Sequence, residues 1–159
     1  MIALSAYPKV YIETEVKEDV LERAAGLIGL EPSIVSLKEV ALGMRKRSKV
    51  RICNNDNKVH RYKIMSMVFP ADPRKRQITI SPGYEWIPQT SWIRPKERWV
   101  RVGPGEAKEI YFAVQISKEK ANYNKMYEGI LFFEPQGGLA GFVRVQIQTE
   151  KFEPEQGEK

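Results

Sequence analysis

An all-β domain, folded as a mostly antiparallel sandwich, is the fold class that this 159-residue sequence predicts. About seven short segments alternate between apolar and polar residues, and turn-forming residues separate them at intervals of about ten residues. The single cysteine, Cys53, excludes an intrachain disulfide, so the fold must depend on buried apolar side chains. A chain of this length can bury such a core within one domain.

The first 31 residues are expected to form an extension ahead of the sandwich. In residues 9–16 an apolar side alternates with an acidic side, which predicts a strand, and residues 17–25 carry apolar residues on one face of a short helix. A strand that precedes a complete sandwich can pair with the edge of a neighbouring subunit. Val10, Ile12 and Val16 are therefore candidate interface residues, with packing into the chain's own sheet as the alternative.

The sandwich itself is expected within residues 32–149, followed by a polar tail over residues 150–159. Alternation predicts that Phe112 and Phe132 lie in the inter-sheet core and that Tyr111 faces the opposite way. The strand patterns occupy residues 33–40, 47–53, 58–69, 98–102, 110–116, 127–134 and 141–148. The polar run 54–57 predicts a hairpin turn, because Asn and Asp tolerate positive φ.

Residues 70–97 form a Pro-rich insertion between two of these strand patterns. Its five prolines favour loops and edge strands and exclude a long helix. Exposed aromatic side chains on such a loop would make a recognition surface, so Trp86, Trp92 and the nearby Arg94 are candidate interface residues. Trp99 lies within a strand pattern and is expected to close one end of the core.

Four segments suggest a more specific architecture: residues 32–37 leading to Gly43, residues 50–55, residues 102–106 running into residues 110–114, and residues 127–132. Their order resembles that of immunoglobulin-like modules found in prokaryotic surface proteins, virion proteins and some intracellular scaffolds. The resemblance implies that the Pro-Gly-Glu turn joins two strands and that the Tyr-Glu-Gly run enters a core strand. It implies an immunoglobulin-like sandwich but no particular function, because this fold hosts many roles.

Catalysis is not expected from this chain. A hydrolase needs a nucleophile, a base and an orienting acid, whereas the sequence offers one His, one Cys and only three Asp. Cys53 and His60 flank the predicted hairpin and can approach as cross-strand neighbours, but no orienting acid accompanies them. Zinc, calcium and phosphate-loop spacings are missing as well. We therefore expect no catalytic residue, no metal and no cofactor.

Basic residues offer a better candidate for a binding site. On a strand, alternate side chains project from one face, and those of residues 45–51 are Arg45, Arg47, Lys49 and Arg51. Such a basic face can be a solvated surface or a protein interface. With aromatic residues nearby, it can also hold single-stranded nucleic acid. The sequence alone leaves these three interpretations open.

The distribution of charge favours assembly. Residues 1–31 hold 3 Lys/Arg against 6 Asp/Glu, a net charge of −3, and residues 32–149 hold 21 against 10, a net charge of +11. Acidic ends and basic bodies of neighbouring copies attract each other. We predict a non-enzymatic structural protein, such as a virion decoration or coat component or a surface-lattice protein, that binds other protein subunits, including copies of itself. A nucleic-acid-binding module is the alternative.

Location is predicted only by exclusion. The N-terminus does not resemble a signal peptide, and no apolar segment approaches the length of a membrane span. We therefore expect synthesis in the cytoplasm, no membrane partner, and a final place in a virion or an extracellular assembly.

Overall fold

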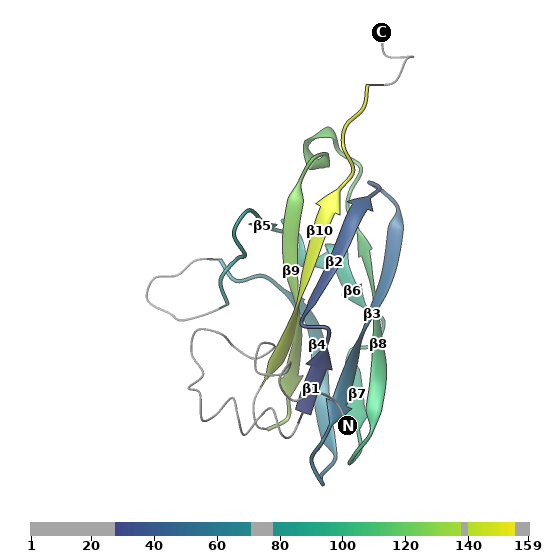
Figure 1. The fold of residues 1–159 in the computed structure, drawn as a ribbon, viewed down its shortest axis with the longest axis vertical. Helices are drawn as coiled ribbons and strands as arrows, with labels where there is room; N and C mark the ends of the chain where they lie inside the picture. The colour runs from purple at the N-terminus through teal and green to yellow at the C-terminus, as the bar shows by residue number, and fades with distance from the viewer. Residues whose placement is uncertain (1–27, 71–77, 138–139, 155–159) are drawn as a thin grey trace.

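The computed structural model describes residues 28–70, 78–137 and 140–154 of the chain. These residues form ten strands and two short 3₁₀ helices, η3 (Thr90–Trp92) and η4 (Lys120–Asn122), and none of them lies in an α-helix. Their strands make two packed sheets, which confirms the predicted all-β sandwich (Figure 1). No helix in these ranges is long and apolar enough to cross a membrane. The strand and helix expected over residues 9–25 lie outside the described residues.

The first sheet, sheet A, has the strand order β1–β3–β8–β6 and is antiparallel throughout. Its strands are β1 (Ile28–Glu31), β3 (Arg45–Asn54), β8 (Ala107–Gln115) and β6 (Ile93–Pro95). The long central pair is β3 with β8, which runs from Arg45 opposite Gln115 to Cys53 opposite Ala107. The short strands β1 and β6 form the two edges of this sheet.

The second sheet, sheet B, has the order β2–β10–β9–β4–β7, and the short strand β5 also pairs with β9. Its strands are β2 (Ile34–Val40), β10 (Gly141–Thr149), β9 (Met126–Pro135), β4 (His60–Met67), β7 (Trp99–Val102) and β5 (Glu85–Trp86). β2 joins β10 in parallel, and β5 joins β9 in parallel. The remaining pairs of sheet B are antiparallel.

The main core lies between the sheets. On β8 the predicted alternation is confirmed, because Phe112 is 2% exposed and Tyr111 on the opposite face is 47% exposed. On β9 the inward residue is Phe133, whereas Phe132 lies on the outer face of sheet B, so the prediction for Phe132 is wrong. Residues 130–133 are all apolar because β9 is covered on both faces. In a continuous apolar run, both sets of alternate residues are apolar, so the sequence does not show which set faces the core.

The polar turn at residues 54–57 joins the two sheets. β3 belongs to sheet A and β4 to sheet B, so the predicted hairpin is wrong. Asn54 is fully buried and closes this connection by donating from Nδ2 to the carbonyl oxygens of Lys58, at 2.7 Å, and Val102, at 2.9 Å. Its Oδ1 accepts the backbone N–H of Asp56 at 2.8 Å. These three hydrogen bonds give every polar atom of the buried Asn54 side chain a partner, and the bond to Val102 on β7 ties the turn to sheet B.

The N-terminal end of the described chain also passes between sheets. β1 pairs with β3 in sheet A, and after Pro32 the chain continues as β2 beside β10 in sheet B. Residues 28–31, which fall within the expected extension, therefore form a strand of the sandwich.

The outer face of sheet B carries a second apolar cluster. Ile78, Ile130 and Phe142 are buried there, and Phe69, Trp86 and Phe132 pack against them. The cluster joins the Pro-rich insertion to β9 and β10. On the opposite face of β9, Gly129 makes room for the main core, since a Cβ atom at this position would collide with Ile93 Cδ1 and lie 2.9 Å from Ile87 Cδ1.

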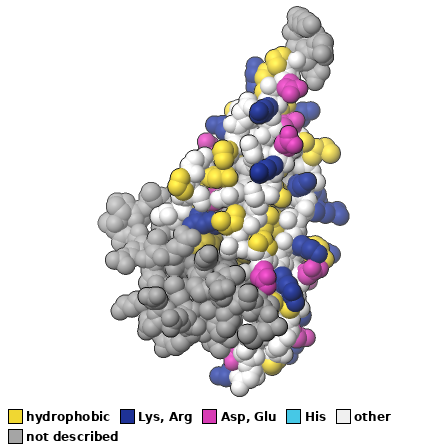
Figure 2. All heavy atoms as spheres, in the orientation of Figure 1, with side chains coloured by type: hydrophobic (Ala, Val, Ile, Leu, Met, Phe, Trp, Pro, Cys, Tyr) yellow, Lys and Arg dark blue, Asp and Glu magenta, His cyan; other side chains and the backbone are white. Residues whose placement is uncertain are grey.

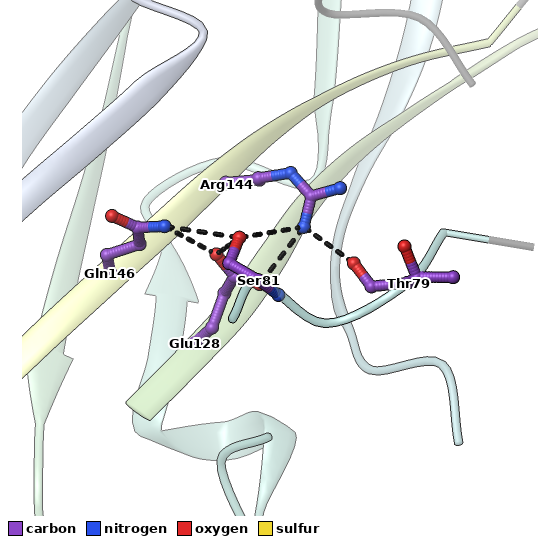
Figure 3. A network of polar contacts seen from close by, with 5 residues as sticks. All are labelled: Thr79, Ser81, Glu128, Arg144 and Gln146. Atoms are coloured by element: carbon purple, nitrogen blue, oxygen red, sulfur yellow. Dashed lines mark hydrogen bonds and ion pairs between the residues drawn. The ribbon is translucent and has the colours of Figure 1, made fainter. Parts of the chain in front are cut away.

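A buried polar network lies beside this cluster and also ties the insertion to the sheet (Figure 3). Glu128 is fully buried on β9 and forms an ion pair at 3.0 Å with Arg144 on β10. Its carboxylate also accepts the backbone N–H of Ser81 at 2.9 Å, the Ser81 hydroxyl at 2.7 Å and the Gln146 amide at 2.8 Å. Arg144 donates to the Thr79 carbonyl oxygen at 2.8 Å. Residues 79–81 are therefore held against sheet B.

Candidate binding groove on the outer face of sheet A

The predicted basic face lies along β3. Val50 and Ile52 point into the core and set the phase of the strand, so alternate residues point outward. The outward, exposed residues are those that the sequence predicted, namely Arg45, Arg47, Lys49 and Arg51. On the face shown in Figure 2, over β2, β9 and β10, Lys and Arg are instead interspersed with acidic and apolar side chains.

A groove with a volume of about 830 Å³ crosses the outer face of β3, β8 and β6. Ala113 on β8 lies opposite both Arg47 on β3 and Arg94 on β6. Its methyl group fills little space, so a hollow remains between the two arginines. The lining residues are Arg45, Arg47, Ser48, Lys49, Arg94, Pro95, Lys96, Tyr111, Phe112 and Ala113, and they include no Asp or Glu.

One end of the groove is neutralised by Glu109. Its carboxylate pairs with Lys49 Nζ at 2.8 Å and accepts the Tyr111 hydroxyl at 2.8 Å. The hydrogen bond and charge of Glu109 raise the pKa values of Lys49 and Tyr111, and the hydrogen bond from Lys49 is the largest cause that lowers the pKa of Glu109. The Lys49 ammonium also lies 6.0 Å from the centre of the Tyr111 ring.

The other cations of the groove lack such a counter-charge. Within the described ranges, Arg45, Arg47, Arg94 and Lys96 form no ion pair with an acidic side chain. Arg94 donates only from Nε, to the Ser91 carbonyl oxygen at 2.9 Å, which fixes its guanidinium and leaves both Nη groups available. The groove is therefore an anion-attracting surface on a rigid sheet.

A smaller hollow of about 340 Å³ continues the groove past Arg45 and Arg94. The other lining residues are Gln89, Ser91, Trp92, Ala113, Gln115 and Ser117. These side chains add neutral hydrogen-bonding groups to the cations, so this end suits a partner with polar as well as acidic groups.

The free edge of β6 does not support strand addition. Lys96 N donates to the Tyr111 carbonyl oxygen at 2.8 Å, so the alternate residues Ile93 and Pro95 face the open edge. The N–H of Ile93 already bonds to the Thr90 carbonyl oxygen, and Pro95 has no N–H. Recognition in the groove must therefore depend on side chains.

The structure corrects the predicted exposure of three tryptophans. Trp92 is only 7% exposed and packs edge-to-face against Tyr127 in the main core, and Trp86 is half-buried against Phe69. Trp99, which was expected in the core, is 48% exposed on β7. Arg94 is exposed and lines the groove. Of the other candidate interface residues, Val10, Ile12 and Val16 lie outside the described residues.

Cys53 and His60 do not form a pair. Cys53 is buried on β3 in sheet A, and His60 begins β4 in sheet B, so they are not cross-strand neighbours. Burial is the main cause that raises the pKa of the Cys53 thiol, which disfavours the nucleophilic thiolate. His60 Nε2 instead lies 2.7 Å from Asp56 Oδ2. Within the described ranges, no group of three His, Cys, Asp or Glu side chains is placed to hold a metal ion.

The sequence did not identify the residues that shape the groove. Alternation places Ala113 and Tyr111 on the outward side of a strand, but their position between Arg47, Lys49 and Arg94 depends on the registers of β8 with β3 and β6. Alternation within each strand was the available signal, but it carries no information on cross-strand register.

Comparison with known proteins concerns the fold alone. No protein-family model matches the chain, and no curated protein sequence matches it. The seventh PapD-like (ASH) domain of human CEP192 is 6% identical, with a TM-score of 0.52 over 80% of this chain and 88% of that one. The YadV chaperone is 11% identical, with a TM-score of 0.51 over 82% of this chain and 56% of that one. A chaperone–tip adhesin complex of CFA/I fimbriae biogenesis is 14% identical, with a TM-score of 0.50 over 80% and 57%. This chain therefore has an immunoglobulin-like, PapD-like β-sandwich fold.

Proposed function

We propose that this chain is a non-enzymatic assembly module in which the basic groove of one copy binds the acidic N-terminal segment of a neighbouring copy. The observation that carries this proposal is the set of cations at the groove, Arg45, Arg47, Arg94 and Lys96, without an ion-paired acid in the described part of the chain. Neighbouring like charges repel each other, and an anionic partner relieves that repulsion.

The N-terminal segment supplies suitable charge. Residues 1–27, which precede β1, hold 5 Asp/Glu against 3 Lys/Arg. Glu13 and Glu15 stand on the same side of the strand predicted for residues 9–16, about 6.8 Å apart if extended. Arg45 and Arg47 on β3 have the same two-residue spacing. A strand laid along the groove would therefore bring acidic and basic side chains into matching positions.

The direction of β1 favours a neighbouring copy over the chain's own groove. Ile28 lies opposite Asn54, whereas Arg45 is at the other end of β3, nine residues and roughly 30 Å away. The chain thus enters β1 at the end of sheet A that is distant from Arg45. A segment that precedes Ile28 has to reverse its direction to reach its own groove, but not to reach that of another copy.

The groove suits an acidic protein segment better than nucleic acid. Its two aromatic lining residues are Tyr111 and Phe112. Phe112 is buried in the core, and Tyr111 is already engaged by Glu109 and Lys49. The groove therefore offers bases a single exposed ring, Tyr111, whose hydroxyl group is already bonded to Glu109. The more specific roles, as a virion decoration or coat component or as a surface-lattice protein, stay predictions of the sequence.

Sedimentation velocity of the full chain over a range of concentrations tests the proposal. We expect the wild-type chain to self-associate with rising concentration at low salt, and Arg47→Glu with Arg94→Glu to remain monomeric. The matched control is Arg61→Glu with Arg101→Glu on sheet B, since two Arg→Glu changes lower the net charge from +6 to +2 in either variant. Equal self-association of the groove variant and the wild-type chain would refute the proposal.

A labelled synthetic peptide of residues 9–25 identifies the occupant. We expect it to bind the wild-type chain and the control, but not the groove variant, in fluorescence anisotropy. If the groove variant fails to assemble while the peptide binds none of the three proteins, the groove is an interface but the assignment of its occupant is wrong.

A further inference from the structure

A second basic surface lies on the outer face of sheet B, where β4 pairs with the edge strand β7. Arg61 is directly opposite Arg101, and Lys63 is directly opposite Trp99. Trp99 is 48% exposed, and the Arg61 guanidinium carbon lies 6.0 Å from the centre of the indole ring. We call these four residues the Trp99 platform.

The composition of the Trp99 platform opposes folding stability. Like charges directly opposite each other on paired strands are destabilising, and the Arg61–Arg101 pair is of this kind. Glu134 on β9 lies opposite Lys63 but makes no ion pair with it, and no other acid in the described ranges pairs with the three cations. A large aromatic side chain left in water adds to the cost. Apart from the contact between Arg61 and the Trp99 ring, the packing of the sandwich gives no reason for this arrangement.

We infer that the Trp99 platform binds single-stranded nucleic acid. An exposed indole offers a face on which a base can stack, and the surrounding guanidinium and ammonium groups can contact the adjacent phosphates. Within β4 and β7, Trp99 is the one exposed large apolar side chain. A protein hot spot is normally enclosed by further contacts that exclude water, so one ring among cations suits a base and its phosphates better.

This surface is separate from the basic groove. The groove lies on the outer face of sheet A, whereas the Trp99 platform lies on the outer face of sheet B. The inference therefore stands or falls independently of the proposed assembly function. One ring and three cations correspond to a footprint of a few nucleotides, with modest affinity and strong dependence on salt.

Fluorescence anisotropy of fluorescein-labelled deoxythymidine decamer, titrated with the full chain at several salt concentrations, tests the inference. Three phosphate contacts predict a slope of about −2 for log affinity against log salt, since each contributes about 0.7 on single strands. We expect Arg61→Ala with Arg101→Ala to reduce that slope to about −0.7. We expect Trp99→Ala to weaken binding by roughly tenfold or more, and Trp99→Phe to restore part of it.

The matched control is Arg47→Ala with Arg94→Ala, which removes two arginines from sheet A and should leave decamer binding unchanged. Thermal unfolding of each variant shows that it remains folded. The decamer should quench the tryptophan fluorescence of the wild-type chain more than that of Trp99→Phe, which retains Trp86 and Trp92. The inference is overturned if the wild-type chain does not bind the decamer, or if Trp99→Ala binds it as tightly as wild type. Loss of binding in the sheet A variant alone would place the nucleic-acid site in the groove, and would also overturn the inference.

Discussion

Replacement of Arg144 by Met tests how much the buried polar network around Glu128 contributes to stability. Glu128 is fully buried and Arg144 is 6% exposed, so their charges are held largely out of water. Arg144→Met keeps an apolar stem but removes the ion pair with Glu128 at 3.0 Å and the hydrogen bond to the Thr79 carbonyl oxygen at 2.8 Å. The Glu128 carboxylate is then left buried with only the neutral donors of Ser81 and Gln146.

The expected loss in the free energy of unfolding is about 3–5 kcal/mol, the range found when one partner of a buried ion pair is removed. That is a large part of the 5–15 kcal/mol that stabilises a typical domain. Because the network holds residues 79–81 against sheet B, we also expect faster amide hydrogen exchange in that segment.

Urea unfolding followed by circular dichroism measures the effect. The critical comparison is the double variant Glu128→Leu with Arg144→Met, which leaves no buried charge and should be markedly more stable than Arg144→Met alone. Glu109→Gln, which breaks the exposed Lys49–Glu109 pair, should change the midpoint little. The reasoning fails if Arg144→Met costs less than about 1 kcal/mol, or if the double variant is no more stable than the single one.

Four further outcomes follow from the structure. Phe112→Ala should lower the free energy of unfolding in urea by about 3–5 kcal/mol, as other large-to-small substitutions in cores do. Tyr111→Ala should lower it much less, and equal losses would contradict the burial assigned to the two faces of β8. Gly129→Ala should lower the melting temperature, because its Cβ would collide with Ile93 and Ile87, and an unchanged melting temperature would show that both side chains can move aside. The hydrogen bond from His60 lowers the pKa of Asp56 below its usual value of 3.8. The Asp56 carboxylate therefore stabilises the fold above about pH 4, and this stabilisation is lost as the pH falls through the lowered pKa. Asp56→Asn should make the melting temperature less dependent on pH in this range, and an unchanged dependence would contradict the hydrogen bond. Deletion of residues 1–27 retains β1 and should leave a folded chain, by circular dichroism, that no longer self-associates; unfolding would instead show that the segment belongs to its own core.

Two of the errors made from sequence have the same physical origin. The turn at residues 54–57 has hairpin chemistry, but the fold uses it to change sheets, because β3 pairs with β8 and β4 pairs with β9. The prolines of the insertion predict an exposed loop, yet Trp86 is half-buried against Phe69 and Trp92 is buried against Tyr127. Turn type and proline content are local properties of the sequence, whereas the strand or sheet that a segment packs against depends on residues distant in the chain.

The fold class, most of the strands and the outward side of β3 could be predicted from the sequence, because each depends on the two-residue period of side chains within one strand. Tertiary structure decided the rest. Only the packing of the sheets showed that Phe133, and not Phe132, enters the core. Only cross-strand register placed Ala113 between Arg47 and Arg94, and Arg61 opposite Arg101 beside Trp99. These juxtapositions join residues from separate strands, and alternation along one strand carries no information about which strand lies beside it or in what register.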